Sequence, residues 1–319
     1  MKDILKHLIV PVLLVGSVAN CGASSPPVVS FQEQSGRIDI LADGKPVATY
    51  RYADPQIPRP YFAHVRTIGG IQVTRNHPPV ADVDATDHDE LHPGIWMAFG
   101  DLGGSDFWRN KARVVHDGFE QKPAGGRGRG SFAVRNRYLT AGDNGGTLCR
   151  ETVRYGVVVR PCGYLLLWDS TFTSDKEFWF GDQEEMGLGL RVATLITVKS
   201  GGIMLDAKGR RNEAQIWGQP ADWCDYSGVI DGHRVGLTVM CDPANFQPSR
   251  YHARDYGFVA ANPFGRKCFK AGEESKVVVK PGESLRLRYG VLVHESPESN
   301  TLDPASEFKL FCTLLERIR

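Results

Sequence analysis

The sequence of 319 residues has no long hydrophobic run beyond its first twenty residues and no excess of charge of either sign. A helix needs about 20 apolar residues to span a bilayer, so no later segment is predicted to cross a membrane. With 38 Lys+Arg against 37 Asp+Glu, the formal net charge is +1, which favours neither nucleic acid nor an anionic membrane as a partner. No C-x-x-C, G-x-S-x-G or H-E-x-x-H motif occurs, which disfavours a zinc ribbon, a serine hydrolase and a zincin.

The first twenty residues have the pattern of a secretory signal. Lys2 and Lys6 precede an apolar run from Leu8 to Ala19, which is too short for a stable membrane anchor. Cleavage after Ala19 and lipidation of Cys21 both remain open. We therefore expect a signal at 1–20, a flexible linker at 21–30 and a single domain over 31–319. The protein is expected in the periplasm or lipid-anchored to the outer membrane, with membrane contact only through the signal or the lipid anchor.

Beyond Cys21 the chain has six cysteines, which are Cys149, Cys162, Cys224, Cys241, Cys268 and Cys312. An exported protein reaches an oxidising compartment where disulfides form. Cys149 and Cys162 lie on segments that read as neighbouring strands, so this pair is the first disulfide we predict. Buried free thiols are the alternative.

Glycine (35) and proline (19) are abundant, which favours strands and turns over helices. Strand patterns occur at 38–41, 47–52, 95–99, 132–139, 164–172, 188–198, 235–241 and 284–294. Only the C-terminus has a helical pattern: Asp303 can cap it, Pro304 suits its first turn, and Phe308, Phe311, Leu315 and Ile318 recur on one face. We predict an all-β fold, a large two-sheet antiparallel β-sandwich with one C-terminal helix.

Polar and aromatic residues concentrate in four stretches, at 59–77, 82–96, 217–228 and 251–265, and the sharpest pair is His88 and His92. The strand expected from Ile95 places both histidines in a loop at a strand entrance, where binding and catalytic groups are often found. Asp82, Asp84, Asp87, Asp89 and Glu90 lie in the same stretch. A divalent metal site, an acid/base site facing a sugar and a solvated acidic loop are the three interpretations.

Two further stretches add candidate partners. His252 and Arg254 alternate, so both point to one side of an extended segment and suit an oxygen-rich or anionic ligand. Trp223 and Tyr226 flank Asp225, and aromatic faces with a carboxylate commonly hold sugars, although core packing explains the same rings. The predicted catalytic residues are His88, His92, His252, Glu185 and Asp225. The predicted substrate-binding residues are Tyr61, Arg75, His77, Trp223, Tyr226, Arg254 and Tyr256.

The ordered motifs resemble a bacterial family of unknown function labelled PmoA-like or "methane oxygenase". The motifs that match are Arg59-Pro60-Tyr61-Phe62, Thr74-Arg75, His92-Pro93-Gly94-Ile95-Trp96, Gly100-Asp101 with Asp106-Phe107-Trp108, Trp223-Cys224-Asp225-Tyr226-Ser227-Gly228, His252-Ala253-Arg254-Asp255-Tyr256-Gly257 and Ala261-Asn262-Pro263-Phe264-Gly265. The resemblance implies an exported β-sandwich protein connected with sugar metabolism. Members commonly carry a third histidine between the positions of His88 and His92, where this chain has Asp89-Glu90-Leu91. By fold-level analogy, the predicted sandwich is also similar to galactose mutarotase-like supersandwiches and polysaccharide lyases.

These features lead to the hypothesis of an exported carbohydrate-active enzyme that works on a glycoside or modified sugar. It would be a hydrolase, a lyase or an epimerase that uses histidine and carboxylate groups for acid-base chemistry on a small-molecule or oligosaccharide ligand. A non-catalytic periplasmic sugar-binding module is the alternative, followed by a metal-dependent oxidoreductase. No cofactor is indicated with certainty, and a divalent metal is the one cofactor considered.

Overall fold

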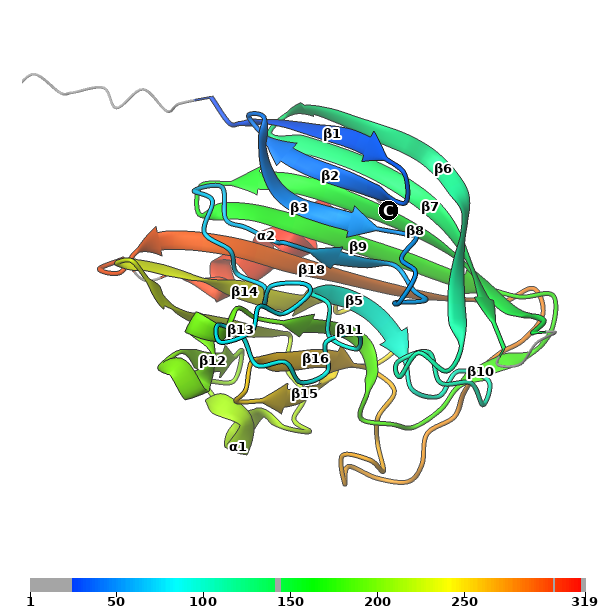
Figure 1. The fold of residues 1–319 in the computed structure, drawn as a ribbon. Coiled ribbons are helices and arrows are strands. Elements are labelled where there is room, and N and C mark those ends of the chain that lie inside the picture. The colour runs from blue at the N-terminus through cyan, green and yellow to red at the C-terminus, as the bar shows by residue number, and fades with distance from the viewer. Residues whose placement is uncertain (1–24, 141–144, 301, 317–319) are drawn as a thin grey trace, which may run out of the picture.

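A computed structural model describes residues 25–140, 145–300 and 302–316 of the chain. Its strands form one antiparallel sheet of sixteen strands in the order β12-β13-β14-β18-β9-β8-β7-β6-β1-β2-β3-β4-β5-β11-β16-β15. This sheet folds over between β6 and β1 into a front layer and a back layer, as Figure 1 shows. The predicted all-β class, with a large antiparallel sandwich and a C-terminal helix, is therefore confirmed.

The back layer consists of β6 (Arg113–Arg127), β7 (Arg129–Leu139), β8 (Thr147–Arg160), β9 (Gly163–Thr173), β18 (Ser284–Pro297), β14 (His233–Cys241), β13 (Trp223–Ile230) and β12 (Ile203–Asp206). The front layer consists of β1 (Val28–Gln34), β2 (Arg37–Ala42), β3 (Lys45–Arg51), β4 (Tyr61–Ala63), β5 (Ile95–Phe99), β11 (Met186–Arg191), β16 (Phe258–Asn262) and β15 (Arg250–Arg254). A separate two-stranded sheet pairs β10 (Phe178–Phe180) with β17 (Val277–Val279). The helices are α1 (Asn212–Ile216), α2 (Pro304–Glu316) and two 3-10 turns, Thr194–Ile196 and Val198–Ser200.

The hydrophobic core lies between the layers and is rich in aromatic rings. Tyr50 of β3 packs against Tyr155 of β8 and Phe132 of β7, with ring centroids 5.0 and 5.2 Å apart. Tyr164 of β9 donates a hydrogen bond across the sandwich to the Val47 carbonyl, at 3.0 Å. Neither layer could bury these rings alone, so the two layers form one folding unit.

One carboxyl group lies inside this core. Glu151 of β8 is 4% exposed and accepts hydrogen bonds from Ser170 Oγ at 2.5 Å and Asn136 Nδ2 at 2.9 Å. Burial raises the pKa of this carboxyl, even though the hydrogen bonds act in the opposite direction.

Helix α2 lies on the outer face of the back layer, visible behind β18 in Figure 1. Its first turn is capped as predicted, because Asp303 Oδ1 accepts a hydrogen bond from the Ala305 amide at 3.1 Å. Phe311 and Leu315 are buried against β9, β14 and β18, as their spacing indicates. Ile318, predicted on the same face, lies outside the described residues.

The backbone departs from the sequence predictions in several places, and strands such as β4, β6 and β13 were not predicted. The strand expected at 188–198 ends at Arg191 and continues as two 3-10 turns, and the short helix α1 was not predicted. Strand β1 begins at Val28, inside the segment predicted to be a linker, because it pairs with β2 and β6. The signal predicted at 1–20 and the processing site at Cys21 lie outside the described residues.

The predicted Cys149–Cys162 disulfide is wrong. Cys149 lies near the start of β8 and Cys162 lies in the turn just beyond its end. A strand advances about 3.3 Å per residue, so the two thiols are separated by the length of the strand. All six cysteines of the described segments are free thiols, and Cys149, Cys224 and Cys241 are buried.

Candidate functional site

The outer face of the front layer carries the residues that are unusual for a sandwich. In β15, Tyr251 and Ala253 face the core, so the alternation of the strand turns His252 and Arg254 outward. The neighbouring strands β16 and β5 contribute Phe258 and Trp96 to a second cluster on this face. Between them β11 contributes Gly189, where a Cβ atom would lie 2.9 Å from the rings of Trp96 and Trp108. The glycine therefore gives these rings room to pack against the sheet.

His88 and His92 stack on this face as part of one turn of the loop before β5. The His92 amide donates to the His88 carbonyl at 2.8 Å, and the imidazole centroids are 4.8 Å apart. His92 is 3% exposed and also stacks on Phe258 at 4.6 Å. Burial, with the positive charge of Arg191 second, lowers the pKa of His92 well below its usual range. The sequence prediction that both histidines lie in a loop at a strand entrance agrees with the geometry, whereas their stacking was not predicted.

Arg75 holds the histidine loop rather than facing a ligand. Its guanidinium donates to four backbone carbonyls of the loop, at distances between 2.6 and 3.3 Å, and its side chain is buried. The acceptors are the carbonyls of Ala85, Asp87, His88 and His92. Because these donors are already used, the substrate-binding role predicted for Arg75 is replaced by a structural one.

Asp87 connects His88 to the sheet. Arg191 of β11, which is 1% exposed, donates to both carboxylate oxygens of Asp87, at 2.8 and 3.0 Å. Asp87 Oδ2 lies 2.9 Å from His88 Nδ1, so this carboxylate orients the imidazole. Partial burial would raise the pKa of Asp87, but the hydrogen bonds from Arg191 and His88 hold it well below its usual range. Asp87 and Arg191 were not among the predicted site residues, although the alternation of β11 turns Arg191 toward the same face as His252.

His252 is the most unusual side chain of the site. It is 5% exposed, and neither of its ring nitrogens has a hydrogen-bond partner. Burial, with the nearby charge of Arg254 second, lowers the pKa of its imidazole to about 3. A buried polar group without a partner is costly in a folded protein, so it is a marker of a functional position.

A polar pocket of about 430 Å³ opens over His252. Its wall includes Arg109, Glu184, Glu185, Arg254 and Tyr256. Glu184 Oε2 lies 3.4 Å from His252 Nε2 and 3.5 Å from the Arg254 guanidinium, whereas Glu185 is paired with Arg109. The structure therefore places Glu184, and not the predicted Glu185, beside the buried histidine.

Tyr256 forms one side of this pocket. The Arg191 guanidinium lies 4.5 Å from the centre of its ring, and the ring is nearly parallel to the His88 imidazole at 6.4 Å. Arg254 is held by Glu213 at 3.1 Å as well as by Glu184. Both Tyr256 and Arg254, predicted to bind substrate, thus line the pocket with His252.

Three predicted residues belong to the back layer and do not line this pocket. Asp225 is buried and accepts hydrogen bonds from Thr238 at 2.7 Å, Ser227 at 2.8 Å and His294 at 2.9 Å. Trp223 packs in the cluster beneath α2. Tyr226 faces the core, and its hydroxyl contacts the backbone of the β15–β16 turn. These residues follow one another along β13, whose alternation sends them to opposite faces of the sheet.

Tyr61 and His77 form a separate contact beside Asp54. The Tyr61 hydroxyl donates to Asp54 Oδ2 at 2.8 Å and lies 3.1 Å from His77 Nε2. Burial lowers the pKa of His77 to about 4. Tyr61 is fully buried and does not line the pocket of His252, so its predicted ligand contact has no support in this geometry. No group of three or more His, Cys, Asp or Glu arranged to hold a metal ion occurs in the described segments.

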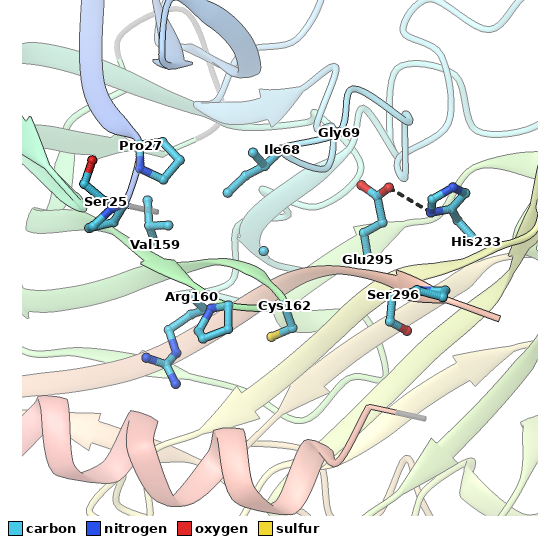
Figure 2. A pocket seen from close by; sticks show the side chains of 14 residues that line it. Ser25, Pro27, Ile68, Gly69, Val159, Arg160, Cys162, His233, Glu295 and Ser296 are labelled. Atoms are coloured by element: carbon cyan, nitrogen blue, oxygen red, sulfur yellow. Dashed lines mark ion pairs between the residues drawn. The ribbon is translucent and has the colours of Figure 1, made fainter. Parts of the chain in front are cut away.

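A larger pocket, about 760 Å³, lies elsewhere (Figure 2). Ile68, Pro27 and Val159 contribute apolar walls, and Figure 2 shows the Glu295 carboxylate pointing toward His233. These two groups are 3.1 Å apart, and the His233 side chain is 46% exposed. His252 is buried, whereas His233 is largely exposed, so we take the smaller polar pocket as the candidate site.

The comparisons with solved structures give low overall similarity. The chain matches a protein named as a kojibiose phosphorylase from the human microbiome at 9% identity and a TM-score of 0.37, covering 92% of this chain and 37% of that one. It matches a 4-alpha-glucanotransferase from Thermococcus litoralis at 9% identity and a TM-score of 0.32, covering 85% of this chain and 40% of that one. The Slr1438 protein from Synechocystis matches at 12% identity and a TM-score of 0.31, with 84% and 96% covered. The chain thus spans about two fifths of the length of the first two proteins, and TM-scores this low carry no argument about activity.

No curated protein sequence matches the chain. Within the described segments, no helix has the length and apolar character needed to cross a membrane. Residues 37–305 match a family of unknown function, DUF6807. This agrees with the prediction of a family without an assigned function, whereas the PmoA-like label stays a prediction. The chain belongs to the DUF6807 family.

Proposed function

We propose that this protein is a carbohydrate-active enzyme in which His252 removes a proton from a sugar. The observation that carries the proposal is the buried His252 imidazole, which lines a polar pocket and has no hydrogen-bond partner on either ring nitrogen. With a pKa of about 3 the ring is uncharged at neutral pH, so one of its nitrogens can accept a proton, and the ring is not present as the imidazolium acid. Glu184, 3.4 Å away, would stabilise the imidazolium that forms.

This protonation state favours a lyase or an epimerase over a hydrolase. Glycoside hydrolysis starts when an acid protonates the leaving oxygen. A lyase or epimerase starts when a base breaks a C–H bond next to a carbonyl or carboxylate, and the electron pair moves onto that oxygen. Arg254 lies in the same pocket and would stabilise the oxyanion. In a lyase the electron pair then expels a substituent from the next carbon, and the leaving oxygen takes the proton from His252. In an epimerase the carbanion instead takes a solvent-derived proton on the opposite face of the ring, and His252 returns its own proton to solvent.

The test is incubation of the protein with pooled oligosaccharides, glycosides, uronides and 3-keto-glycosides, followed by mass spectrometry. In D₂O, an epimerase incorporates one deuterium without other change, and a lyase gives an unsaturated fragment. In H₂¹⁸O, a hydrolase instead gives a fragment that contains ¹⁸O. We expect one of the first two products from the wild type and a loss of at least 100-fold in His252→Gln.

The matched control is His233→Gln, which removes a histidine that is paired on the surface outside this pocket. It should retain wild-type turnover. A hydrolytic product, or full activity of a folded His252→Gln variant, would contradict the proposed role of His252. Saturable sugar binding without any product would instead indicate the binding module.

We also propose that the protein is exported, because residues 1–20 have the pattern of a secretory signal. The intact mass of the protein recovered from its native host tests this. A chain that starts at Asn20 would indicate ordinary cleavage, and a diacylglyceryl mass on Cys21 would indicate a lipoprotein. A chain that retains residues 1–20 in the cytoplasm would overturn the proposal.

A further inference from the structure

A second pocket adjoins the candidate site, on the other side of Tyr256. It measures about 270 Å³, and its wall includes Asp87, Arg191, Thr197, Lys199 and Ser200. Tyr256 belongs to the walls of both pockets. A ligand longer than one sugar ring could therefore place neighbouring rings on the two sides of this tyrosine.

The second pocket has a net positive charge. The charges of Asp87 and Arg191 offset each other, which leaves that of Lys199. Asp87 is the only carboxylate in the wall, and both of its oxygens are already engaged by Arg191. Arg75 also lies close to this carboxylate, with its Nη1 atom 3.7 Å from Asp87 Oδ1. Lys199 is exposed, and its side chain has no ion pair within the described segments. The ammonium group of Lys199 is thus available to an anionic ligand.

The remaining groups of the wall suit a sugar. Thr197 and Ser200 form a hydroxyl pair 2.9 Å apart at the 3-10 turn Val198–Ser200. The turn is fixed to the β15–β16 connection, because the Lys199 amide donates to the Asp255 carbonyl at 3.3 Å. Hydroxyl groups beside an aromatic ring and a cation form a common arrangement for a charged saccharide.

We propose that this second pocket binds the anionic substituent, carboxylate or sulfate, of a sugar next to the one that reacts over His252. The inference rests on the proposed function and narrows its substrate to an acidic oligosaccharide. Proton abstraction also requires an acidified C–H bond, which the carboxylate of a uronic acid supplies. A uronic acid over His252 beside a second anionic sugar would satisfy both pockets.

The experiment measures binding by calorimetry, with methyl glucuronide, a sulfated methyl glucoside and neutral methyl glucoside as the probes. The wild type should bind at least one of the anionic probes about fivefold more tightly than the neutral one, as expected for a solvent-accessible ion pair. Lys199→Glu should abolish this preference. Lys176→Glu, which makes the same charge change on an exposed loop outside both pockets, should leave it intact. Comparison of the two anionic probes distinguishes a carboxylate from a sulfate site.

Equal affinity of the wild type for all three probes would overturn the inference, as would a preference that survives Lys199→Glu. These outcomes are independent of the proposed catalysis. If His252→Gln abolishes turnover while Lys199→Glu leaves the anion preference unchanged, the function stands and the subsite is wrong. If no substrate turns over but Lys199 determines anion binding, the subsite stands and the catalytic proposal is wrong.

Discussion

The buried His252 should make the folding stability of the protein fall at acidic pH. The unfolded imidazole takes up a proton near its ordinary pKa of 6.5, whereas the folded one does so only at about pH 3. Between these values the unfolded state binds more protons, so stability that is complete above pH 6.5 is lost as the pH falls. The free energy of unfolding should fall between pH 7.5 and pH 4.5 in both proteins. We expect this fall to be about 2 to 3 kcal/mol smaller in His252→Gln than in the wild type. Urea unfolding at both pH values checks this, and an equal loss in both proteins would refute it.

Glu151 has the opposite pH dependence. Burial raises the pKa of this core carboxyl, so the folded state holds its proton to higher pH than the unfolded state does. Its contribution is neutral below the unfolded pKa and becomes unfavourable as the pH rises through the folded pKa. Glutamine preserves a carbonyl acceptor and removes the ionisation. We therefore expect the melting temperature of Glu151→Gln, measured relative to that of the wild type, to be higher at pH 7.5 than at pH 4.5.

A Glu151→Leu variant is the control for the hydrogen bonds of that network. It also removes the ionisation, but it leaves Asn136 and Ser170 without their acceptor. It should therefore be less stable than Glu151→Gln at both pH values, since a buried polar group without a partner costs about 1–3 kcal/mol. A Glu151→Gln effect that is identical at both pH values would show that ionisation is not its cause.

At the scale of single elements, Gly189 of strand β11 leaves room for the aromatic rings on which the candidate site packs. An alanine at Gly189 would place its Cβ 2.9 Å from the rings of Trp96 and Trp108, which pack beneath His92. Overpacking of this kind costs about 1–3 kcal/mol. We expect Gly189→Ala to lower stability by this amount in urea unfolding. Gly146→Ala is the control, because a Cβ there has open space within 4 Å and should change stability little. A Gly189→Ala variant as stable as the control would contradict this packing argument.

Sequence patterns identified the elements that have regular periodicity. The alternation in 284–294 and the spacing of Phe311 and Leu315 gave β18 and α2, because one face of each is buried. Short strands such as β4 and β16 were missed; their residues are buried on both faces, so no alternation marks them, although the equally buried β5 was found from its apolar run. For the candidate site, sequence patterns likewise identified neighbours along one strand but not contacts between distant segments. Alternation correctly paired His252 with Arg254, but only the fold shows that Glu184 approaches His252 and that Asp225 faces away.

At the scale of the whole molecule, the shared core predicts one cooperative unfolding transition. Phe62 of the front layer packs against Tyr155 and Trp168 of the back layer, with centroids 5.1 and 5.7 Å apart, and the sixteen strands are continuous. Loss of either layer would expose the inner face of the other. Fluorotryptophan labelling gives a probe in each layer, since Trp96 lies in β5 and Trp168 in β9.

We therefore expect the ¹⁹F signals of Trp96 and Trp168 to disappear with the same urea midpoint. Trp96→Phe and Trp168→Phe variants would assign the two signals. A reducing agent should not move that midpoint, because the six cysteines of the described segments are free thiols. Two separate midpoints would instead mean that the front layer, which carries His92 and His252, opens while the back layer stays folded. In that case the stability of the candidate site would have to be measured apart from that of the sandwich, because local opening alone would then expose His252 to solvent.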